Sequence, residues 1–283
     1  MARNNGDRLG APSVAAADPP ITDAPPNPAL AFATPTMFVD LPSRGRLYPE
    51  SHPLHGCEQL EIRFMTAKEE DILTSQSLLK KGIAIDRMLQ NVILDPRVKV
   101  AELAVGDKNA IIIAARISGY GSDYEINVTC PSCAAKVEYN FDLELATTNY
   151  GDDPGEYDVT QTDQGSYIIK TPRLSAEVEV RPMYGVDEKY LTQLAANKKR
   201  KNLPETALTD QLKRLIVSVN GNTDTAYRES FISQAPASEA RYIRRAYRQM
   251  LPNIDLTQEF TCSSCGVETE MEVPLTAKFF WAQ

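Results

Sequence analysis

Apolar and polar residues alternate in several short stretches of the chain, and between these stretches apolar residues recur at helical spacing. Residues 58–64 alternate as a half-buried β-strand does. Directly after this strand, Thr66 and Glu69 have the spacing of a capping box, which marks a helix N-terminus. We expect this helix to run from Thr66 to about Leu79, with Gly82 just beyond its C-terminal end.

The pattern continues to the first pair of cysteines. A second helix is expected over residues 84–94, because Asp95-Pro96 disfavours its continuation. A third is expected to start after Asp107 and to end near Gly119, and its many isoleucines and alanines predict that it is buried. Residues 124–128 and 136–141 then alternate as two strands, with two cysteines in the turn between them. This segment predicts a β-hairpin with thiols at its tip.

The second half of the chain repeats this pattern. Residues 60–65 (LEIRFM) are matched by residues 178–183 (VEVRPM), and an acidic helix start follows each of them. A helix over residues 238–251 again precedes a cysteine hairpin, whose strands are expected at 258–261 and 268–273. We interpret this order as a tandem duplication rather than a chance likeness of two hairpins. The prediction is an α+β fold with an arm (1–36), a first repeat (37–146), a linker (147–165) and a second repeat (166–283).

Residues 1–36 differ from the rest of the chain in composition. They contain seven of the 19 prolines and have no apolar period that could build a packed face. Two interpretations are open: a tail that stays disordered, or an extended arm that becomes ordered on a neighbouring subunit. In either case we expect this segment to lie outside the protein's own core.

The chain has 283 residues, of which 42% are hydrophobic, and a formal net charge of −8. This length can bury a core without help from a metal. The longest apolar run, residues 110–115, is far shorter than the roughly 20 residues of a membrane helix, so no membrane span is expected. The N-terminus lacks the apolar core of a secretory signal, which favours a reducing cytoplasm and free thiols. The acidic charge disfavours a protein that coats nucleic acid.

Four of the five cysteines form two Cys-x-x-Cys pairs, each between alternating strands. Two such hairpins can bring four thiolates to the corners of a tetrahedron, which is the ligand set of a closed structural zinc site. Redox dithiols normally sit at the start of a helix after a strand, so a redox role is disfavoured. The predicted zinc ligands, one pair from each repeat, are Cys130, Cys133, Cys262 and Cys265.

Other candidate chemistry is weaker. Both histidines lie near the fifth cysteine, as His52-x-x-His55-x-Cys57, but this loop contains proline and glycine, and we interpret it as a surface turn rather than a second metal site. The sequence has no GxSxG, Walker, GxGxxG, HExxH or EF-hand motif. We therefore expect a protein that is not an enzyme.

One predicted helix of the second half carries four arginines at positions i, i+3, i+4 and i+7. Its buried side is expected to consist of Ile243, Ala246, Tyr247 and Met250. At this spacing the arginines repel one another unless acidic groups face them. Pairing within this acidic chain is one interpretation, and a docking face for an acidic neighbouring protein is the other. The four arginines are Arg241, Arg244, Arg245 and Arg248.

Several motifs follow one another along the chain: LPSRGxLYP at 41–49, MTAKEEDIL at 65–73, GDKNA at 106–110, YGxxY at 120–124, CPxC at 130–133 and FFW at 279–281. As a set they resemble the T-even-type bacteriophage baseplate hub family. The resemblance covers about residues 37–283 and leaves out the N-terminal arm. It implies a protein that is made in the host cytoplasm, lies in the virion tail baseplate and binds other phage tail proteins or copies of itself, without catalysis.

Two functions are compatible with these features. The first is a structural component, or an assembly factor, of a phage tail baseplate. The alternative is a zinc-ribbon regulator that binds nucleic acid through the basic run at 198–201 and the four arginines. The acidic net charge favours the first.

Overall fold

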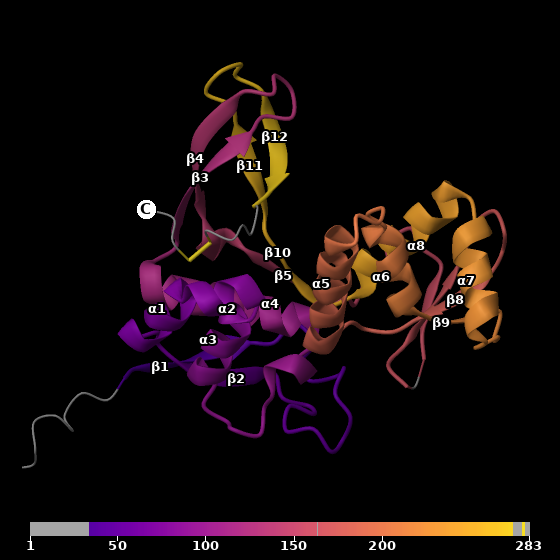
Figure 1. Ribbon diagram of the computed structural model, residues 1–283, viewed down its shortest axis with the longest axis horizontal. Coiled ribbons are helices and arrows are strands. Elements are labelled where there is room, and N and C mark those ends of the chain that lie inside the picture. Colours follow the sequence, from indigo (N-terminus) through magenta and orange to yellow (C-terminus); the bar gives the residue numbers. More distant parts are fainter. Residues whose placement is uncertain (1–33, 163, 274–278, 281–283) are drawn as a thin grey trace, which may run out of the picture. The chain divides into compact units, whose positions relative to one another are not determined.

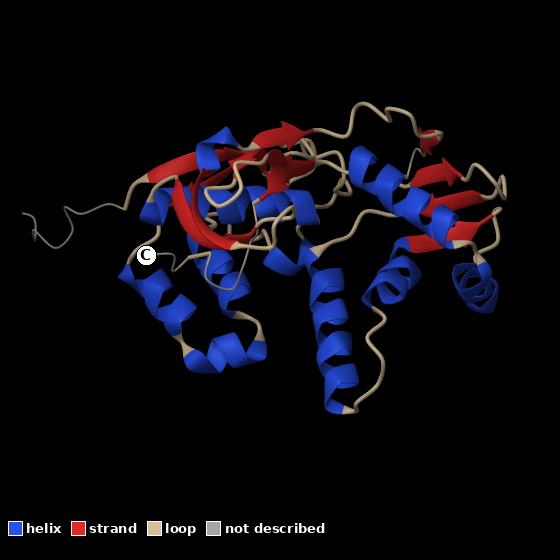
Figure 2. Cartoon of the chain, turned by 90° about the horizontal axis from the view of Figure 1, so that it is seen from above, coloured by secondary structure: helices blue, strands red, loops and turns tan. Residues whose placement is uncertain are grey.

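The computed structural model describes residues 34–162, 164–273 and 279–280 (Figure 1). Most of the predicted arm, residues 1–36, lies outside the described residues, and so does Trp281 of the C-terminal motif. Thr36, placed at the end of the arm, instead begins the first strand and pairs with Arg63. Helices and strands are interspersed along the chain, and the strands form several small sheets (Figure 2). The expected mixture of helices and strands is confirmed.

The first half begins with an antiparallel strand pair, continues through helices and ends in a long β-hairpin. Its strands and helices lie close to the predicted bounds, with the exception of the first helix. The elements are β1 (Thr36–Asp40), β2 (Gln59–Arg63), α1 (Ala67–Thr74), α2 (Gln76–Lys81), α3 (Ala84–Val92), the 3-10 helix η3 (Val100–Glu102), α4 (Val105–Tyr120), β3 (Asp123–Thr129), β4 (Lys136–Asp142) and the 3-10 helix η4 (Leu143–Leu145).

The single helix expected from residue 66 to residue 79 is wrong, because it breaks at Ser75, whose backbone is extended (φ −63°, ψ 108°). The hydroxyl of Thr74 bonds to the carbonyl oxygen of Glu70, 2.8 Å away, and such bonds compete with the helical ladder. Gly82 does end the second piece, with a left-handed φ of 66° that glycine adopts without strain.

The second half contains a four-stranded antiparallel sheet in the order β6-β7-β8-β9, with helices before and after β9. The predicted linker, 147–165, is not free of regular structure: it contains β5, which pairs with β10 more than a hundred residues later, and β6. The elements are β5 (Thr147–Asn149), β6 (Val159–Gln161), β7 (Tyr167–Lys170), β8 (Glu177–Val180), α5 (Gly185–Arg200), α6 (Ala207–Leu215), β9 (Ile216–Val219), α7 (Thr225–Gln234), α8 (Ala237–Met250), β10 (Asn253–Asp255), β11 (Thr257–Thr261) and β12 (Glu268–Glu272).

Each half has the same junction between a strand and the helix that follows it. At the end of β2, Arg63 donates two hydrogen bonds to Glu69 in the first turn of α1, and Glu69 also accepts the backbone amide of Thr66. At the end of β8, 118 residues later, Arg181 and Asp187 make the same paired contact, and Asp187 accepts the amide of Tyr184.

Strand pairing follows the same correspondence. Ile62 of β2 bridges to Ile93 just after α3, and Val180 of β8 pairs with Ile216 just after α6. Both halves thus have a strand, helices, a returning strand residue, a helix and a hairpin in this order, and the second half has the additional helix α7 after the returning strand. This agreement extends the sequence match from residue identity to backbone pairing.

Two hydrophobic cores stabilise the described chain. The larger is built mainly by the first half, and it also takes in Phe260, Cys262 and Val273 from the second hairpin and Phe279 and Phe280 near the C-terminus. The smaller core packs the sheet β6-β7-β8-β9 against α6 and α8. The second hairpin therefore packs with the first half rather than with its own.

Candidate metal centre

The first cysteine hairpin is a regular antiparallel ladder of seven residue pairs, from Asp123 opposite Asp142 to Thr129 opposite Lys136. At its tip the amide of Cys130 donates to the carbonyl of Ala135 (2.9 Å), and the amide of Ala134 donates back to Cys130 (3.0 Å). Alternation of apolar and polar residues sets this register, since a slip of one residue would turn Val128 and Val137 to solvent.

The second hairpin repeats this turn. The amide of Cys262 donates to Val267 (2.9 Å), and the amide of Gly266 donates back to Cys262 (2.8 Å). Gly266 has a φ of 69°, and the equivalent Ala134 has 57°, a conformation uncommon for residues other than glycine. Both turns aim a buried first cysteine and an exposed second cysteine at the same point.

The four sulfur atoms converge, with every pair within 4.8 Å. Two of these approaches cross between the hairpins: Cys130 Sγ lies 3.9 Å from Cys265 Sγ, and Cys133 Sγ lies 3.8 Å from Cys262 Sγ. A tetrahedral zinc with sulfur ligands at about 2.3 Å places its sulfurs about 3.8 Å apart, whereas a disulfide requires about 2.05 Å. The thiols are free, and their spacing fits one tetrahedral metal ion.

The electrostatics of the four thiols are uneven. The Val267 amide acts to lower the pKa of Cys265, but hydrogen bonding with the neighbouring thiols outweighs it and raises this pKa to about 12. The backbone amide of Cys133, with that of Ser132, points at the Cys130 sulfur and lowers the pKa of this thiol to about 7. A lowered pKa means that the thiolate, the form that binds metals, is accessible near neutral pH.

Contacts beyond the sulfurs hold the hairpins together. The Tyr139 hydroxyl donates to the carbonyl oxygen of Glu259 (3.0 Å), and the Tyr139 ring packs edge-on against Phe260 (5.0 Å between centroids). Farther down, the side chain of Gln258 accepts from the Asp142 amide and donates to the Asp142 carbonyl. These contacts were not predicted, because alternation shows which side chains point inward but not which strand they meet.

The three candidate ligands of the histidine loop contact other groups of the loop. His55 bonds to the backbone of Tyr48, Cys57 contacts the backbone of Pro53, and the His52 ring stacks on Tyr48 at 4.5 Å. Among the described residues, the four hairpin cysteines are the one cluster of three or more His, Cys, Asp or Glu side chains close enough to share a metal ion. The preference for a turn over a metal site agrees with these contacts, although the His52 side chain is largely buried.

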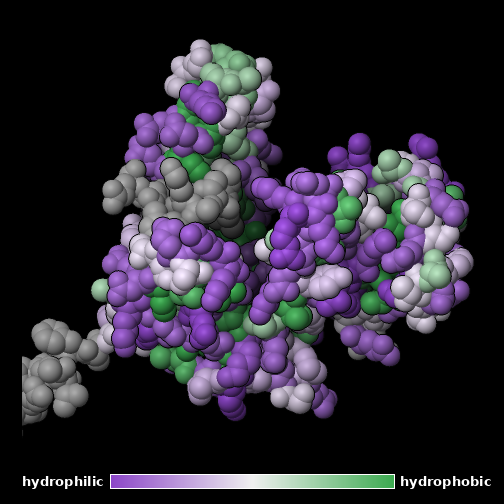
Figure 3. All heavy atoms as spheres, viewed as in Figure 1, coloured by the Kyte–Doolittle hydropathy of each residue, from purple (hydrophilic) through white to green (hydrophobic). Residues whose placement is uncertain are grey.

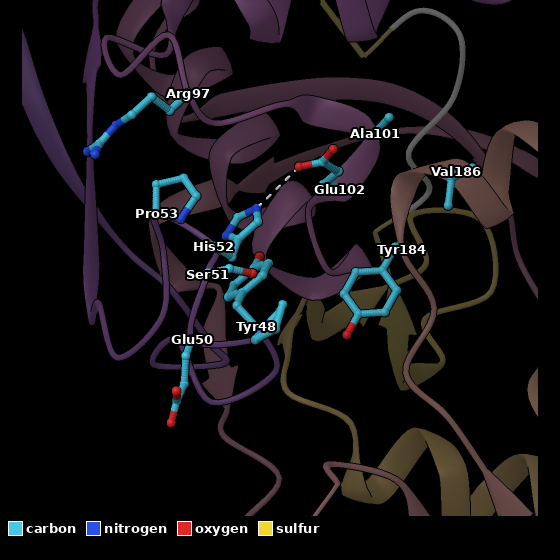
Figure 4. Close-up of a pocket in the computed structure, with 11 residues that line it drawn as sticks. Tyr48, Glu50, Ser51, His52, Pro53, Arg97, Ala101, Glu102, Tyr184 and Val186 are labelled. Carbon is cyan, nitrogen blue, oxygen red and sulfur yellow. Dashed lines mark ion pairs between the residues drawn. The ribbon is translucent and has the colours of Figure 1, made fainter.

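His52 also lines an open cavity of about 960 Å³ (Figure 4). Its Nε2 atom lies 3.6 Å from Glu102, and Tyr184 and Val186 of the second half form the opposite wall. Burial lowers the pKa of His52, and the Glu102 carboxylate opposes this effect only in part. The cavity therefore favours an uncharged imidazole beside a carboxylate.

A buried carboxylate in α4 is a site that the sequence did not reveal. Asp107, expected to precede the helix, lies inside its first turn and accepts bonds from the Ser43 amide (2.9 Å), the Ser43 hydroxyl (2.6 Å) and the Tyr48 hydroxyl (2.7 Å). Burial raises the pKa of Asp107, and these three bonds offset only part of the rise. Ser43 and Tyr48 belong to the LPSRGxLYP motif, so this motif anchors the β1–β2 loop to α4.

The four predicted partner-binding arginines lie on α8. Arg241, Arg245 and Arg248 are exposed and Arg244 is half-buried. Within the described residues none of them takes part in a hydrogen bond or an ion pair. Among the described residues, the structure therefore does not have the arginines of α8 paired with acidic groups.

The visible face over α1, α2 and α5 is mainly hydrophilic (Figure 3). No helix in the described part of the chain is long and apolar enough to cross a bilayer.

Comparison with known proteins gives one match. The model of a family described as T4 bacteriophage base plate protein matches residues 34–281. No curated protein and no solved structure matches the chain.

Proposed function

The chain belongs to the T4 bacteriophage base plate protein family, and from this membership we propose that it is a non-catalytic structural component, or an assembly factor, of the tail baseplate that acts by binding other tail proteins. Family membership supports a baseplate component in the virion tail. The finer role is supported by the exposed arginines of α8, which have no partner among the described residues and suit a surface that binds another protein.

Within this role we assign the four cysteines to one structural zinc ion. The observation that carries this proposal is the convergence of four free thiols, two from each half, at the spacing of a zinc tetrahedron. Zinc bound there would join segments 129 residues apart and contribute its binding free energy to folding. Its task would be to keep the two hairpins in one orientation on the first core.

We further propose that the two halves arose by duplication. The matching Arg63–Glu69 and Arg181–Asp187 junctions, the matching strand bridges and the matching hairpin turns support this origin. A pseudo-twofold relation that superposes residues 58–142 on 176–273 is the corresponding prediction. Packing of the second hairpin into the first core is a departure from strict symmetry that such a relation must accommodate.

The function is tested by complementation of a phage that lacks this gene. The wild-type protein should restore tails and be found in them, and it should contain one zinc per chain by elemental analysis. Cys262→Ser should lose both metal and incorporation, while Cys57→Ser, the matched thiol outside the cluster, should keep both. Tails that form normally without the gene would contradict the baseplate role, and a folded wild-type protein without metal would contradict the zinc assignment.

A further inference from the structure

Helix α8 has a counterpart in α4, 132 residues earlier. The rest of the chain covers one face of α4 but leaves the equivalent face of α8 exposed. On α4, Asn109 bonds to Asn253 (3.1 Å), and Ile113 lies against residues at the foot of the second hairpin. Arg116 is buried and donates to the carbonyl oxygens of Phe279, Gly121 and Asp123. This face of α4 is therefore covered by the chain itself.

The equivalent face of α8 is uncovered and basic. Positions 109, 113 and 116 of α4 correspond to Arg241, Arg245 and Arg248, which are exposed. The acidic segment 152–158 passes along the neighbouring edge of α8, but its bonds go to Tyr242 and Gln249 rather than to the arginines. Four like charges at this spacing repel one another when nothing opposes them.

A complementary surface lies on the second hairpin. The outward side of β11 and β12 carries four exposed carboxylates, and Glu259 lies directly opposite Glu270 in the ladder. Like charges directly opposite each other destabilise a strand pair. Within the described residues no cation pairs with these carboxylates. The four are Glu259, Glu268, Glu270 and Glu272.

The first hairpin shares part of this charge. The positions equivalent to Glu259, Glu268 and Glu272 are Asn127, Lys136 and Asn140, which are neutral or basic, but Glu138 corresponds to Glu270. The same face of the first hairpin also carries Asp123, Glu125 and Asp142, where Lys136 opposes the charge and Asn140 donates to Asp123. The outward face of the second hairpin has four acids and no basic residue. These acids and the arginines of α8 are both costly in an isolated chain, and each group would be relieved by the other.

We propose that the α8 arginine face of one copy binds the outward face of the β11–β12 hairpin of a second copy. The dimensions agree, since seven residues of helix span about 10 Å and four residues of strand span about 13 Å. The two surfaces are different parts of one chain, so the contact is head-to-tail and propagates into a ring or an open array. This inference rests on the proposed function, in which the protein works inside a multi-subunit assembly.

The test is self-association of the zinc-loaded full chain, followed by sedimentation velocity at low and moderate salt. The wild type should associate at low salt and dissociate as salt screens the contact. R241E/R245E and E259K/E270K should each weaken self-association more than about tenfold, because like charges then meet. An equimolar mixture should restore association, since every helix then meets a hairpin of opposite sign.

The control variant K199E/K201E makes the same change in net charge as R241E/R245E, at the exposed end of α5, and should associate as the wild type does. Unchanged zinc content and melting temperature show that each variant is folded. A wild type that stays monomeric, single variants that still associate, or a mixture that is not restored would overturn the proposal. So would salt-sensitive retention of mixed DNA that R241E/R245E abolishes, because nucleic acid would then occupy the arginine face. Complementation by a monomeric protein would overturn this contact and leave the baseplate role standing.

Discussion

The two halves of the chain agree at their strand-to-helix junctions and differ at the helix that precedes each cysteine hairpin. The junctions pair an arginine with a buried acid in both places, Arg63 with Glu69 and Arg181 with Asp187. The helices differ because α4 is covered by the foot of the second hairpin, whereas α8 presents arginines that no other described residue pairs with.

This difference separates contacts that maintain the fold from contacts that are free for other molecules. A feature present in both halves has an internal reason, since each half needs it to close its own strand and helix. A feature present in one half, such as the arginine face, has no counterpart among the internal contacts of the other. Comparison of equivalent positions therefore finds a surface that composition alone does not.

The largest effect is expected at the metal ligands, where the two halves should behave alike. Cys130→Ser and Cys262→Ser should each lower the free energy of unfolding by about 4 kcal/mol or more, because three thiolates cannot complete a tetrahedral site. Cys57→Ser should cost less than about 1 kcal/mol. Chemical denaturation with metal analysis measures both. Equal costs for all three variants would contradict a shared metal centre.

The next largest effect is a difference in stability cost between substitutions of the equivalent buried acids in α4 and α8. Asp107 accepts three bonds and Glu239 accepts one, from the Leu174 amide. Asp107→Ala should therefore cost about 3 kcal/mol and Glu239→Ala about 1 kcal/mol, since more buried donors lose their partner in the first case. Denaturation midpoints of the two variants measure the difference. A larger cost for Glu239→Ala would show that the bonds from Ser43 and Tyr48 to Asp107 are not what stabilises α4.

A smaller difference is expected at the shared junction. Asp187 is bonded by both Arg181 and Arg214, whereas Arg63 is the one cation that pairs with Glu69 in the described part of the chain. Arg63→Ala should cost about 2 kcal/mol and Arg181→Ala about 1 kcal/mol, because Arg214 still faces the second acid. The double variant R181A/R214A should approach the cost of Arg63→Ala. Single substitutions of equal cost would mean that Arg214 contributes nothing.

The smallest effect is the pH dependence of the first junction. Burial acts to raise the pKa of Glu69, but the bonds from Arg63 and Thr66 outweigh it and lower this pKa from 4.5 to about 2. The unfolded chain therefore binds the proton more readily, so the stability from this pair is present above pH 4.5 and is lost as the pH falls towards 2. In urea titrations between pH 4.5 and 2, the free energy of unfolding should fall less steeply with pH in Glu69→Gln than in the wild type. If the free energy of unfolding fell equally steeply with pH in both proteins, the lowered pKa of Glu69 would be contradicted.

Local elements could be read from the sequence because their determinants are local. The capping box at Thr66 and Glu69, the left-handed glycine at Gly82 and the alternation around each cysteine pair lie within a few residues of the structure that they specify. The four cysteines could be assigned to one cluster because thiol ligand spacing restricts the geometry. The convergence of the sulfurs agrees with that prediction.

Long-range arrangements could not be read in this way. The pairing of β5 with β10 joins two three-residue strands with no alternation long enough to detect. The packing of Phe260 in the core of the other half depends on the shape of both hairpins rather than on any periodicity. The buried bonds of Asp107 were missed because an acid near a helix N-terminus has an ordinary explanation, and its partners lie 64 and 59 residues away.

The separation of the two cysteine pairs has a consequence for synthesis on the ribosome. Cys133 is translated 129 residues before Cys262, and at about 5–20 residues per second the first hairpin waits roughly 6–26 s for its partner. During this interval its two thiols are half of a ligand set. They can be oxidised, or they can share a metal ion with a hairpin of another nascent chain on the same messenger. Zinc supply and translation speed should therefore set the yield of correctly joined protein, and slow codons between the pairs should lower it.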